Sequence, residues 1–292
     1  MFQSAYRCFT VHIESMKRIF FASLVLVAFA FSVSAEAEPK ILARIALVSD
    51  PHVNRATNGA NATFKGHFEK AIAAVNSAKV DFVLIAGDLT QSGEPEEMGD
   101  FKKQIKKIRA PVWFVPGNHD VGHKFNSGKS EGTVTLERVA LFEKELGPSF
   151  FARKNSSIRI IGVNSSIFGS GFECEKLQWK FLEKEFTKPS RAPTVLFMHY
   201  PPFLKTPDEP GGHYYNIEPE PRDRLLTLLK QAGVKTVLTG HLHRQLVNRN
   251  DEILFITTPP VSFGLPKGSP EGWTLISLPV EGEAKWEFQT IE

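Results

Sequence analysis

Five short apolar runs, each followed at once by a polar cluster, constrain the fold of this chain more than any other feature. The runs are rich in Val, Ile and Leu, and Gly or Pro bounds them. Runs of this kind are typical of buried β-strands. Each run and the polar residues that follow it together occupy positions 45–52, 82–89, 112–120, 194–201 and 235–243. Helical patterns lie between the runs, and this alternation predicts parallel βαβ units over roughly the first half of the chain.

Further helix and strand patterns fill the rest of the chain. Apolar spacing and terminal signals predict helices at 63–79, 101–108, 136–146, 174–186 and 222–232. Additional strands are predicted at 157–163, 252–257, 273–278 and 285–289. No linker rich in Pro, Gly or Ser divides the sequence and no internal repeat is visible, so we expect one domain.

The sequence begins with the pattern of an export signal. Two basic residues precede an uninterrupted apolar run over 19–33, and a small-residue cleavage pattern ends at Ala35. The run is shorter than the ~20 residues that a membrane-spanning helix needs. We expect a secretory signal peptide that starts at Met16 behind an upstream extension (1–15), and a mature domain over 36–292 without a membrane span. The mature protein would be periplasmic or extracellular; the alternatives for the run are a buried helix or a membrane anchor.

Composition excludes several classes of protein. The chain has 35 basic and 32 acidic side chains, which gives no sign of the basic face that nucleic-acid-binding domains usually show. We therefore expect no specific nucleic-acid binding. Only 2 Cys are present, too few for a disulfide-dense scaffold or a Cys-based zinc ribbon. Any metal site must use carboxylates and imidazoles, so the 9 His become candidate ligands.

The polar clusters behind the five apolar runs carry the candidate site. In chain order they hold Asp50, His52, Asp88, Asn118, His119, Asp120, His199, His241 and His243. Because the carboxyl ends of strands in an open α/β sheet face one crevice, we expect these side chains to converge. Each uncompensated charge there would cost several kcal/mol, whereas a pair of divalent metal ions turns the charges into ligands. One such residue alone is more often a turn residue or a satisfied core group; the whole set predicts a metal site.

The spacing within the clusters supports this hypothesis. In the first and last clusters, two candidate ligands are separated by one residue, which places both on one face of an extended backbone. Glycine directly precedes three of the clusters, where the chain must turn without a Cβ clash. These glycines are Gly87, Gly117 and Gly240.

Taken in order, the clusters resemble the signature of the calcineurin-like metallophosphoesterase family. The matching blocks are Asp50-x-His52, Gly87-Asp88, Gly117-Asn118-His119-Asp120, His199 and Gly240-His241-x-His243. The resemblance covers the chain from about residue 45 to at least residue 243, and it is specific because five separated blocks match. The later part, with His199-Tyr-Pro-Pro and Tyr214-Tyr215-Asn216, is also similar to the branch called calcineurin-like phosphoesterase domain-containing protein 1.

This resemblance implies a fold and a set of ligands. The fold would be of the α/β class, with two mixed β-sheets packed as a sandwich and helices on both outer faces. The ligands of one metal ion would be Asp50, His52 and His243. Those of the other would be Asn118, His199 and His241, and Asp88 would bridge the two. Nitrogen and oxygen donors without thiolate suit Mn, Fe or Zn, and the sequence does not choose among them.

The resemblance also implies a reaction, in which a metal-bridging hydroxide attacks the phosphorus of a phosphate ester. We hypothesise that His119 protonates the leaving oxygen and that Asp120 orients His119; in the alternative, His119 only forms hydrogen bonds beside the ligands. The branch resemblance favours a phosphomonoesterase, with protein phosphatases included. A cyclic-nucleotide or other phosphodiesterase is the second candidate. Outside the enzymes, a protein that binds metal and phosphate without catalysis is expected to have lost a ligand or His119, and this sequence retains them.

The longest irregular stretch, 201–221, follows directly on His199. An irregular stretch of this length in a compact domain is usually functional, so we expect it to form a wall of the site. The candidates for substrate contact are His213, Tyr214 and Tyr215 in this stretch, and His123 after the third cluster. The alternative is an ordinary surface loop. The sequence does not indicate an oligomeric state.

Overall fold

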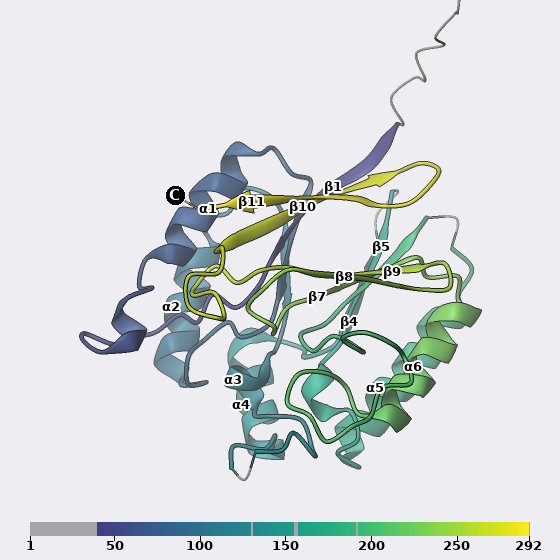
Figure 1. Ribbon diagram of the computed structural model, residues 1–292, viewed down its shortest axis with the longest axis horizontal. Coiled ribbons are helices and arrows are strands. Elements are labelled where there is room, and N and C mark those ends of the chain that lie inside the picture. Colours follow the sequence, from purple (N-terminus) through teal and green to yellow (C-terminus); the bar gives the residue numbers. More distant parts are fainter. Residues whose placement is uncertain (1–39, 130, 155–156, 191, 292) are drawn as a thin grey trace, which may run out of the picture. The chain divides into compact units, whose positions relative to one another are not determined.

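The computed structural model describes residues 40–291 except 130, 155–156 and 191. Within this part of the chain, strands form two mixed β-sheets (Figure 1). The order of one sheet is β11 (Lys285–Thr290), β10 (Gly272–Pro279), β1 (Ile41–Val48), β2 (Phe82–Ala86) and β3 (Val112–Val115). The order of the other is β4 (Phe151–Lys154), β5 (Arg159–Gly162), β6 (Thr194–Phe197), β7 (Thr236–Thr239), β9 (Ile253–Thr257) and β8 (Leu246–Asn250). The expected signal peptide lies outside the described residues.

Helices cover the two outer faces of the sheets. Their bounds are α1 (His67–Ser77), α2 (Pro95–Ile105), α3 (Asn118–Val121), α4 (Leu136–Leu146), α5 (Glu173–Thr187) and α6 (Pro219–Gln231), with short 3-10 turns at Ala60–Ala62 and Ser165–Ile167. In Figure 1, α1 and α2 lie beside the sheet that contains β1, and α5 and α6 lie on the opposite side of the molecule. Helix α1 buries an apolar stripe that includes Phe68, Ile72 and Val75.

Alternation along the strands builds three apolar layers. In β1, Ala46 and Val48 pack with the residues of α1 and α2, whereas Ile45 and Leu47 pack against the second sheet. A third layer lies between the second sheet and the helices α5 and α6. This arrangement confirms the predicted sandwich of two mixed sheets flanked by helices.

The five apolar runs of the sequence are divided between the sheets. The first three are the parallel strands β1, β2 and β3, and the last two are β6 and β7 of the other sheet. The single open sheet used to predict convergence therefore differs from the observed arrangement. The polar clusters meet because strands of both sheets lead into one region of the sandwich.

Several elements differ from their predicted form. Strands β4 and β8 and the short helix α3 were not predicted. Strand β8 (LVNRN) lacks an apolar alternation, and its pairing with β9 determines its conformation. Helix α6 begins at Pro219, three residues before the predicted start. Proline is tolerated there because the first-turn N–H groups have no acceptor within a helix. No helix in the described part of the chain is long and apolar enough to cross a bilayer.

Candidate metal centre

The polar clusters bring two overlapping groups of ligand atoms together. One group contains Asp50, His52, Asp88 and His243, and the other contains Asp88, His199 and His241. Within each group, the ligand atoms all lie within 4.8 Å of one another, and every residue is buried. Asp88 belongs to both groups. The geometry is therefore that of two neighbouring sites that share one carboxylate.

Three of the four histidines in these groups, His199, His241 and His243, are oriented by backbone carbonyls. His199 Nδ1 contacts the Ala86 carbonyl at 2.7 Å, and His243 Nδ1 contacts the Phe263 carbonyl at 2.6 Å. His241 uses its other nitrogen, since Nε2 lies 3.1 Å from the Tyr214 carbonyl. A carbonyl can only accept, so each of these nitrogens carries the ring proton. The opposite nitrogen of each neutral ring presents a lone pair to the group, as in metal-bound histidines.

When the rings are neutral, these lone pairs face other acceptors. His243 Nε2 lies 3.4 Å from Asp50 Oδ1, and His199 Nε2 lies 3.3 Å from Asp88 Oδ2. The Nε2 atoms of His52 and His243 are 3.3 Å apart. Asn118 joins the second group, with Oδ1 3.0 Å from His199 Nε2. In the neutral rings these acceptors repel one another unless a proton or a metal cation lies between them, so the residues fit a metal-binding role. Their mixed N and O chemistry suits Mn, Fe or Zn.

The pKa values of the buried groups indicate that the carboxylates create a negative potential at this site. Burial opposes the charging of His199, but the neighbouring carboxylate of Asp88 raises its pKa to about 9. Burial likewise opposes ionisation of Asp50, and His243 lowers its pKa to about 2. For His52, burial prevails and lowers the pKa to about 3, which keeps this ring neutral. The centre of the group thus stabilises positive charge and holds at least one imidazole in the ligand form.

The backbone at the ligands is strained. Positive φ angles occur at Asp50 (54°), His52 (44°), Asp88 (49°), His241 (72°) and His243 (51°). Non-glycine residues seldom adopt this left-handed region, and each such residue costs of order ~1–3 kcal/mol. Five residues of one site share this conformation, so we infer that the surrounding structure holds the loops in place. The strained backbone directs the five side chains toward one another.

Two of the glycines before the clusters are required for different reasons. Gly87 has a φ of 88°, and a Cβ there would lie 2.6 Å from His199 Nδ1. Gly117 has an extended φ of −109°, so it does not provide a sharp left-handed turn. A Cβ on Gly117 would lie 2.2 Å from Asp88 Oδ1 instead. The predicted turn role holds for Gly87, whereas Gly117 is needed for close packing against the shared carboxylate.

His119 lies between the ligand groups and an open cleft. Its backbone N–H donates to Asp88 Oδ1 at 2.8 Å, and its Nδ1 contacts the Gln91 carbonyl at 2.6 Å. Nδ1 therefore carries the proton in the neutral ring, and Nε2 is the nitrogen left for another partner. The side chain is one of those that line the cleft. This placement is compatible with proton transfer to or from a bound molecule.

The structure corrects the role expected for Asp120. Its Oδ2 accepts hydrogen bonds from the N–H groups of Leu89 (3.0 Å) and Gly117 (2.8 Å). Its Oδ1 accepts from the N–H (3.0 Å) and the hydroxyl (2.8 Å) of Thr90. Burial and the nearby charge of Asp88 raise the Asp120 pKa to about 6. Asp120 thus ties the loop after β2 to the loop after β3, and the Gln91 carbonyl orients His119.

The candidates for substrate contact have different surroundings. Tyr214 and Tyr215 line the cleft. The Tyr214 hydroxyl also accepts from Asn118 Nδ2 at 3.2 Å, and its ring lies 4.8 Å from the His241 ring, so Tyr214 contacts two ligands. His123 packs its ring against Tyr214 at 5.2 Å and is not among the residues that line the cleft. His213 is exposed, and it is likewise not among the residues that line the cleft.

The stretch 201–221 is anchored at several points. Glu209 accepts hydrogen bonds from the N–H of Leu204 (2.6 Å) and from the side chain of Asn216 (2.6 Å). The buried Lys124 donates to Glu218, which directly precedes α6. Burial lowers the Lys124 pKa, and the contact with Glu218 opposes this shift. These anchors hold Tyr214 against the ligands, as expected for a wall of the site.

The cleft has about 450 Å³ and includes residues that the sequence analysis missed. Its ligand-side lining consists of Asp88, His119, His241 and His243. The missed residues are Leu242, Arg244, Phe263, Leu265 and Pro266, whereas Leu204 lies in the stretch 201–221 that was expected to form a wall. Leu242 and Arg244 lie beside the final ligands in the sequence, so adjacency was an available signal. Phe263, Leu265 and Pro266 belong to an irregular segment after β9, for which no sequence motif exists.

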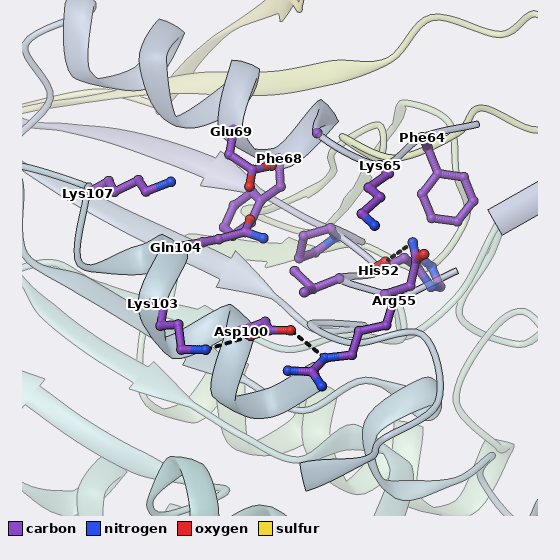
Figure 2. A pocket seen from close by; sticks show the side chains of 14 residues that line it. His52, Arg55, Phe64, Lys65, Phe68, Glu69, Asp100, Lys103, Gln104 and Lys107 are labelled. Atoms are coloured by element: carbon purple, nitrogen blue, oxygen red, sulfur yellow. Dashed lines mark hydrogen bonds and ion pairs between the residues drawn. The ribbon is translucent and has the colours of Figure 1, made fainter. Parts of the chain in front are cut away.

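A second, basic pocket borders His52 (Figure 2). It has about 310 Å³ and lies between the loop after β1, the start of α1 and the helix α2. The side chains of Lys65 and Lys107 lie at this pocket, as Figure 2 shows. Arg55 and Lys103 share the carboxylate of Asp100, at 2.7 Å and 2.9 Å. This pocket is separate from the cleft, because no residue lines both.

Comparison with known proteins adds a family relationship. Residues 43–245 match the family model described as calcineurin-like phosphoesterase. The chain is 32% identical over 251 residues to the probable glycerophosphodiester phosphodiesterase GpdQ of Arcobacter nitrofigilis, a match that covers 82% of each protein. It is 29% identical over 209 residues to the serine/threonine-protein phosphatase CPPED1 of Danio rerio. That match covers 66% of this chain and 64% of the relative, less than two thirds of its length.

Solved structures show a related fold. The purple acid phosphatase PPD1 from yellow lupin superposes with a TM-score of 0.60 over 87% of this chain and 52% of the lupin chain. The sequence identity is 15%. This likeness supports the sandwich architecture, and at this identity it concerns the fold alone.

Proposed function

This chain belongs to the calcineurin-like phosphoesterase family, and we propose that it hydrolyses phosphate esters with two divalent metal ions. The observation that carries the proposal is the pair of buried ligand groups that share Asp88. Lone pairs of imidazoles and carboxylates face one another there at 3.3–3.4 Å, an arrangement that a cation stabilises. We assign one ion to Asp50, His52 and His243, the other to Asn118, His199 and His241, and Asp88 to both.

Each group of the chain has a proposed task in this reaction. Two metal ions held by these residues would polarise phosphoryl oxygens and supply an activated water. Asn118 contributes a neutral oxygen, which limits the negative charge that an anionic substrate meets. His119, with its Nδ1 proton on the Gln91 carbonyl, directs Nε2 to the leaving oxygen and provides its proton when the ring is protonated. Tyr214 orients Asn118 through its hydroxyl, and Asp120 joins the loop after β2 to the loop after β3 by hydrogen bonds.

The test is hydrolysis by the purified chain after chelation and after reconstitution with Mn, Fe or Zn. p-Nitrophenyl phosphate reports monoesterase activity and bis(p-nitrophenyl) phosphate reports diesterase activity. We expect no turnover in chelated protein and restored turnover with at least one metal. A protein with two bound metal ions that cleaves neither ester would instead be a metal- and phosphate-binding protein without catalysis.

We propose monoester hydrolysis as the first activity, with phosphoproteins among the substrates, because of the similarity to CPPED1. A specific observation favours diester hydrolysis as the second candidate. The match to the probable phosphodiesterase covers 82% of both proteins, against 64% of the phosphatase relative. The ratio of rates on the two p-nitrophenyl esters separates these activities.

We also propose that the mature protein is exported. The support is the apolar run over 19–33 and the small-residue pattern that ends at Ala35. Amino-terminal sequencing of the protein from the periplasmic and secreted fractions tests this proposal. A mature terminus at residue 36 is the expected result, and an uncleaved chain that stays inside the cell contradicts it.

A further inference from the structure

Two large apolar side chains are exposed at the mouth of the cleft. Tyr215 is 55% exposed and Leu265 is 49% exposed. They come from distant parts of the sequence, yet both line the same cleft. The other large apolar side chains that are exposed in the described residues, Ile41, Leu136, Leu177 and Val280, do not line it. Apolar surface kept exposed beside a site is typical of a ligand-binding groove.

Both residues are anchored by contacts with ligand residues or their neighbours, Leu265 through its backbone and Tyr215 through its ring. The Leu265 N–H donates to the carbonyl of His243 at 3.0 Å. Tyr215 packs edge to face on Tyr214 with 5.6 Å between ring centres, and Tyr214 in turn contacts Asn118. Directly after Tyr215, Asn216 and Ile217 are buried and anchored, which fixes the loop. The apolar surface therefore has a defined position relative to the proposed metal ions.

The lining of the cleft combines two kinds of side chain. The polar and charged ones are those of the proposed ligands Asp88, His241 and His243, together with His119, Tyr214 and Arg244. The apolar or aromatic ones are those of Leu204, Tyr215, Leu242, Phe263, Leu265 and Pro266. A molecule whose phosphate lies at the ligands places the rest of its structure against these apolar side chains. The volume of about 450 Å³ leaves room for a group as large as an aromatic ring.

We propose that the substrate of this site is a phosphate ester of an apolar or aromatic alcohol, whose organic group docks between Tyr215 and Leu265. The inference depends on the proposed hydrolysis for its reaction. In that reaction a P–O bond forms to the oxygen of water, the P–O bond to the apolar alcohol breaks, and a proton from water ends on the alcohol oxygen. Esters of small polar alcohols gain no apolar burial at this surface and are poorer substrates.

The experiment compares 2-phenylethyl phosphate with glycerol 1-phosphate, which are both monoesters of primary alcohols. In metal-reconstituted wild type, we expect kcat/KM to be roughly 30-fold higher for the phenylethyl ester, since burial of a phenyl group favours binding by such a factor. The double variant Tyr215→Ala with Leu265→Ala should lower kcat/KM for the phenylethyl ester about tenfold through KM. Its loss of kcat/KM on glycerol 1-phosphate should be much smaller, because that ester gains little from the two apolar side chains.

The matched control is Leu136→Ala with Leu177→Ala, because these side chains are each 50% exposed and lie outside the cleft. This control should behave like wild type on both esters. Equal rates of wild type on the two esters, or an equal loss on both in the cleft variant, would overturn the proposal.

A binding measurement keeps this inference separate from the proposed hydrolysis. Metal-loaded protein is titrated calorimetrically with 2-phenylethylphosphonate and with 2-hydroxyethylphosphonate, neither of which contains a cleavable ester bond. Tighter binding of the phenyl compound, lost in the cleft variant, supports the apolar site even if no ester is hydrolysed. Equal affinities for the two phosphonates contradict it even if hydrolysis is observed.

Discussion

The Tyr214 hydroxyl accepts a hydrogen bond from the side-chain amide of Asn118, with 3.2 Å between the two heavy atoms. The backbone carbonyl of the same tyrosine lies 3.1 Å from His241 Nε2. One residue of the stretch 201–221 thus determines which atom of Asn118 and which nitrogen of His241 face the proposed second metal ion. A wall of the cleft is in this way also part of the support of the metal centre.

Tyr214→Phe removes the hydroxyl and keeps the backbone carbonyl. Because Asn118 then loses the acceptor that orients its amide, we expect metal affinity at the second site to fall about tenfold, with the fold unchanged. Metal titration followed by calorimetry measures the two sites. Tyr215→Phe is the matched control, since the Tyr215 side chain is exposed beside the same loop. Equal affinities in the two variants would show that the hydroxyl contact does not support the ligand.

His119→Ala tests proton transfer to the leaving group. We expect the variant to retain its metal ions and to lose about 10²–10⁴-fold in kcat on esters of alkyl alcohols. On p-nitrophenyl phosphate the loss should be much smaller, because p-nitrophenolate leaves without protonation. Steady-state kinetics on both esters, with metal content measured in parallel, gives the answer. An equal loss on both esters, or loss of metal, would assign His119 a structural role.

Gly117→Ala tests the close contact behind the shared carboxylate. A Cβ at this position would lie 2.2 Å from Asp88 Oδ1, so Asp88 must move and both sites should lose most of their metal. Gly99→Ala is the control, since a Cβ at Gly99 in α2 meets no atom within 4 Å. We expect that change to stabilise the protein by about 0.5–1 kcal/mol, because alanine favours helix. Full metal content in Gly117→Ala would refute the packing argument.

Asp100 provides a pH-dependent contribution at the basic pocket of Figure 2. Its hydrogen bonds with Arg55 and Lys103 lower its pKa from 3.8 to about 2. The folded carboxyl binds its proton more weakly than the unfolded one, so its contribution to stability is present above about pH 4 and disappears as the pH falls towards 2.

Because these ion pairs are exposed, Asp100→Asn should lower Tm at pH 7 by at most about 3 °C. The difference between variant and wild type should shrink on acidification from pH 5 to pH 3. Thermal unfolding followed by circular dichroism over this range measures it. A difference that grows as the pH falls would give Asp100 the opposite sign of pKa shift.

The strands and the residues that follow them were predictable because local sequence determines both. A run such as 82–86 is buried along its whole length, and the polar residues that directly follow it are confined to the end of the strand. Charged side chains that are buried together must be compensated, and this requirement identified the ligand groups. The division of the strands between two sheets could not be read from the runs themselves, since buried strands of either sheet have the same pattern.

The supports of the site were not predictable from local sequence. The partner of the His119 ring is a backbone carbonyl 28 residues away, and any residue type could supply it. The contact between Asn118 and Tyr214 joins positions 96 residues apart. Left-handed backbone at aspartate and histidine ligands has no sequence signal, because glycine is the residue that usually marks it. The apolar wall at Phe263 and Leu265 follows β9 without a motif.

The most direct test of the account is the metal content of purified wild type and of Asp88→Ala, measured by mass spectrometry after exhaustive dialysis. Asp88 is the residue common to both ligand groups, so its loss should affect both ions. We predict two divalent ions per chain in wild type, fewer than one in the variant, and phosphate release only from the wild type. One ion per chain in wild type, or two ions in Asp88→Ala, would contradict a dinuclear centre bridged by Asp88.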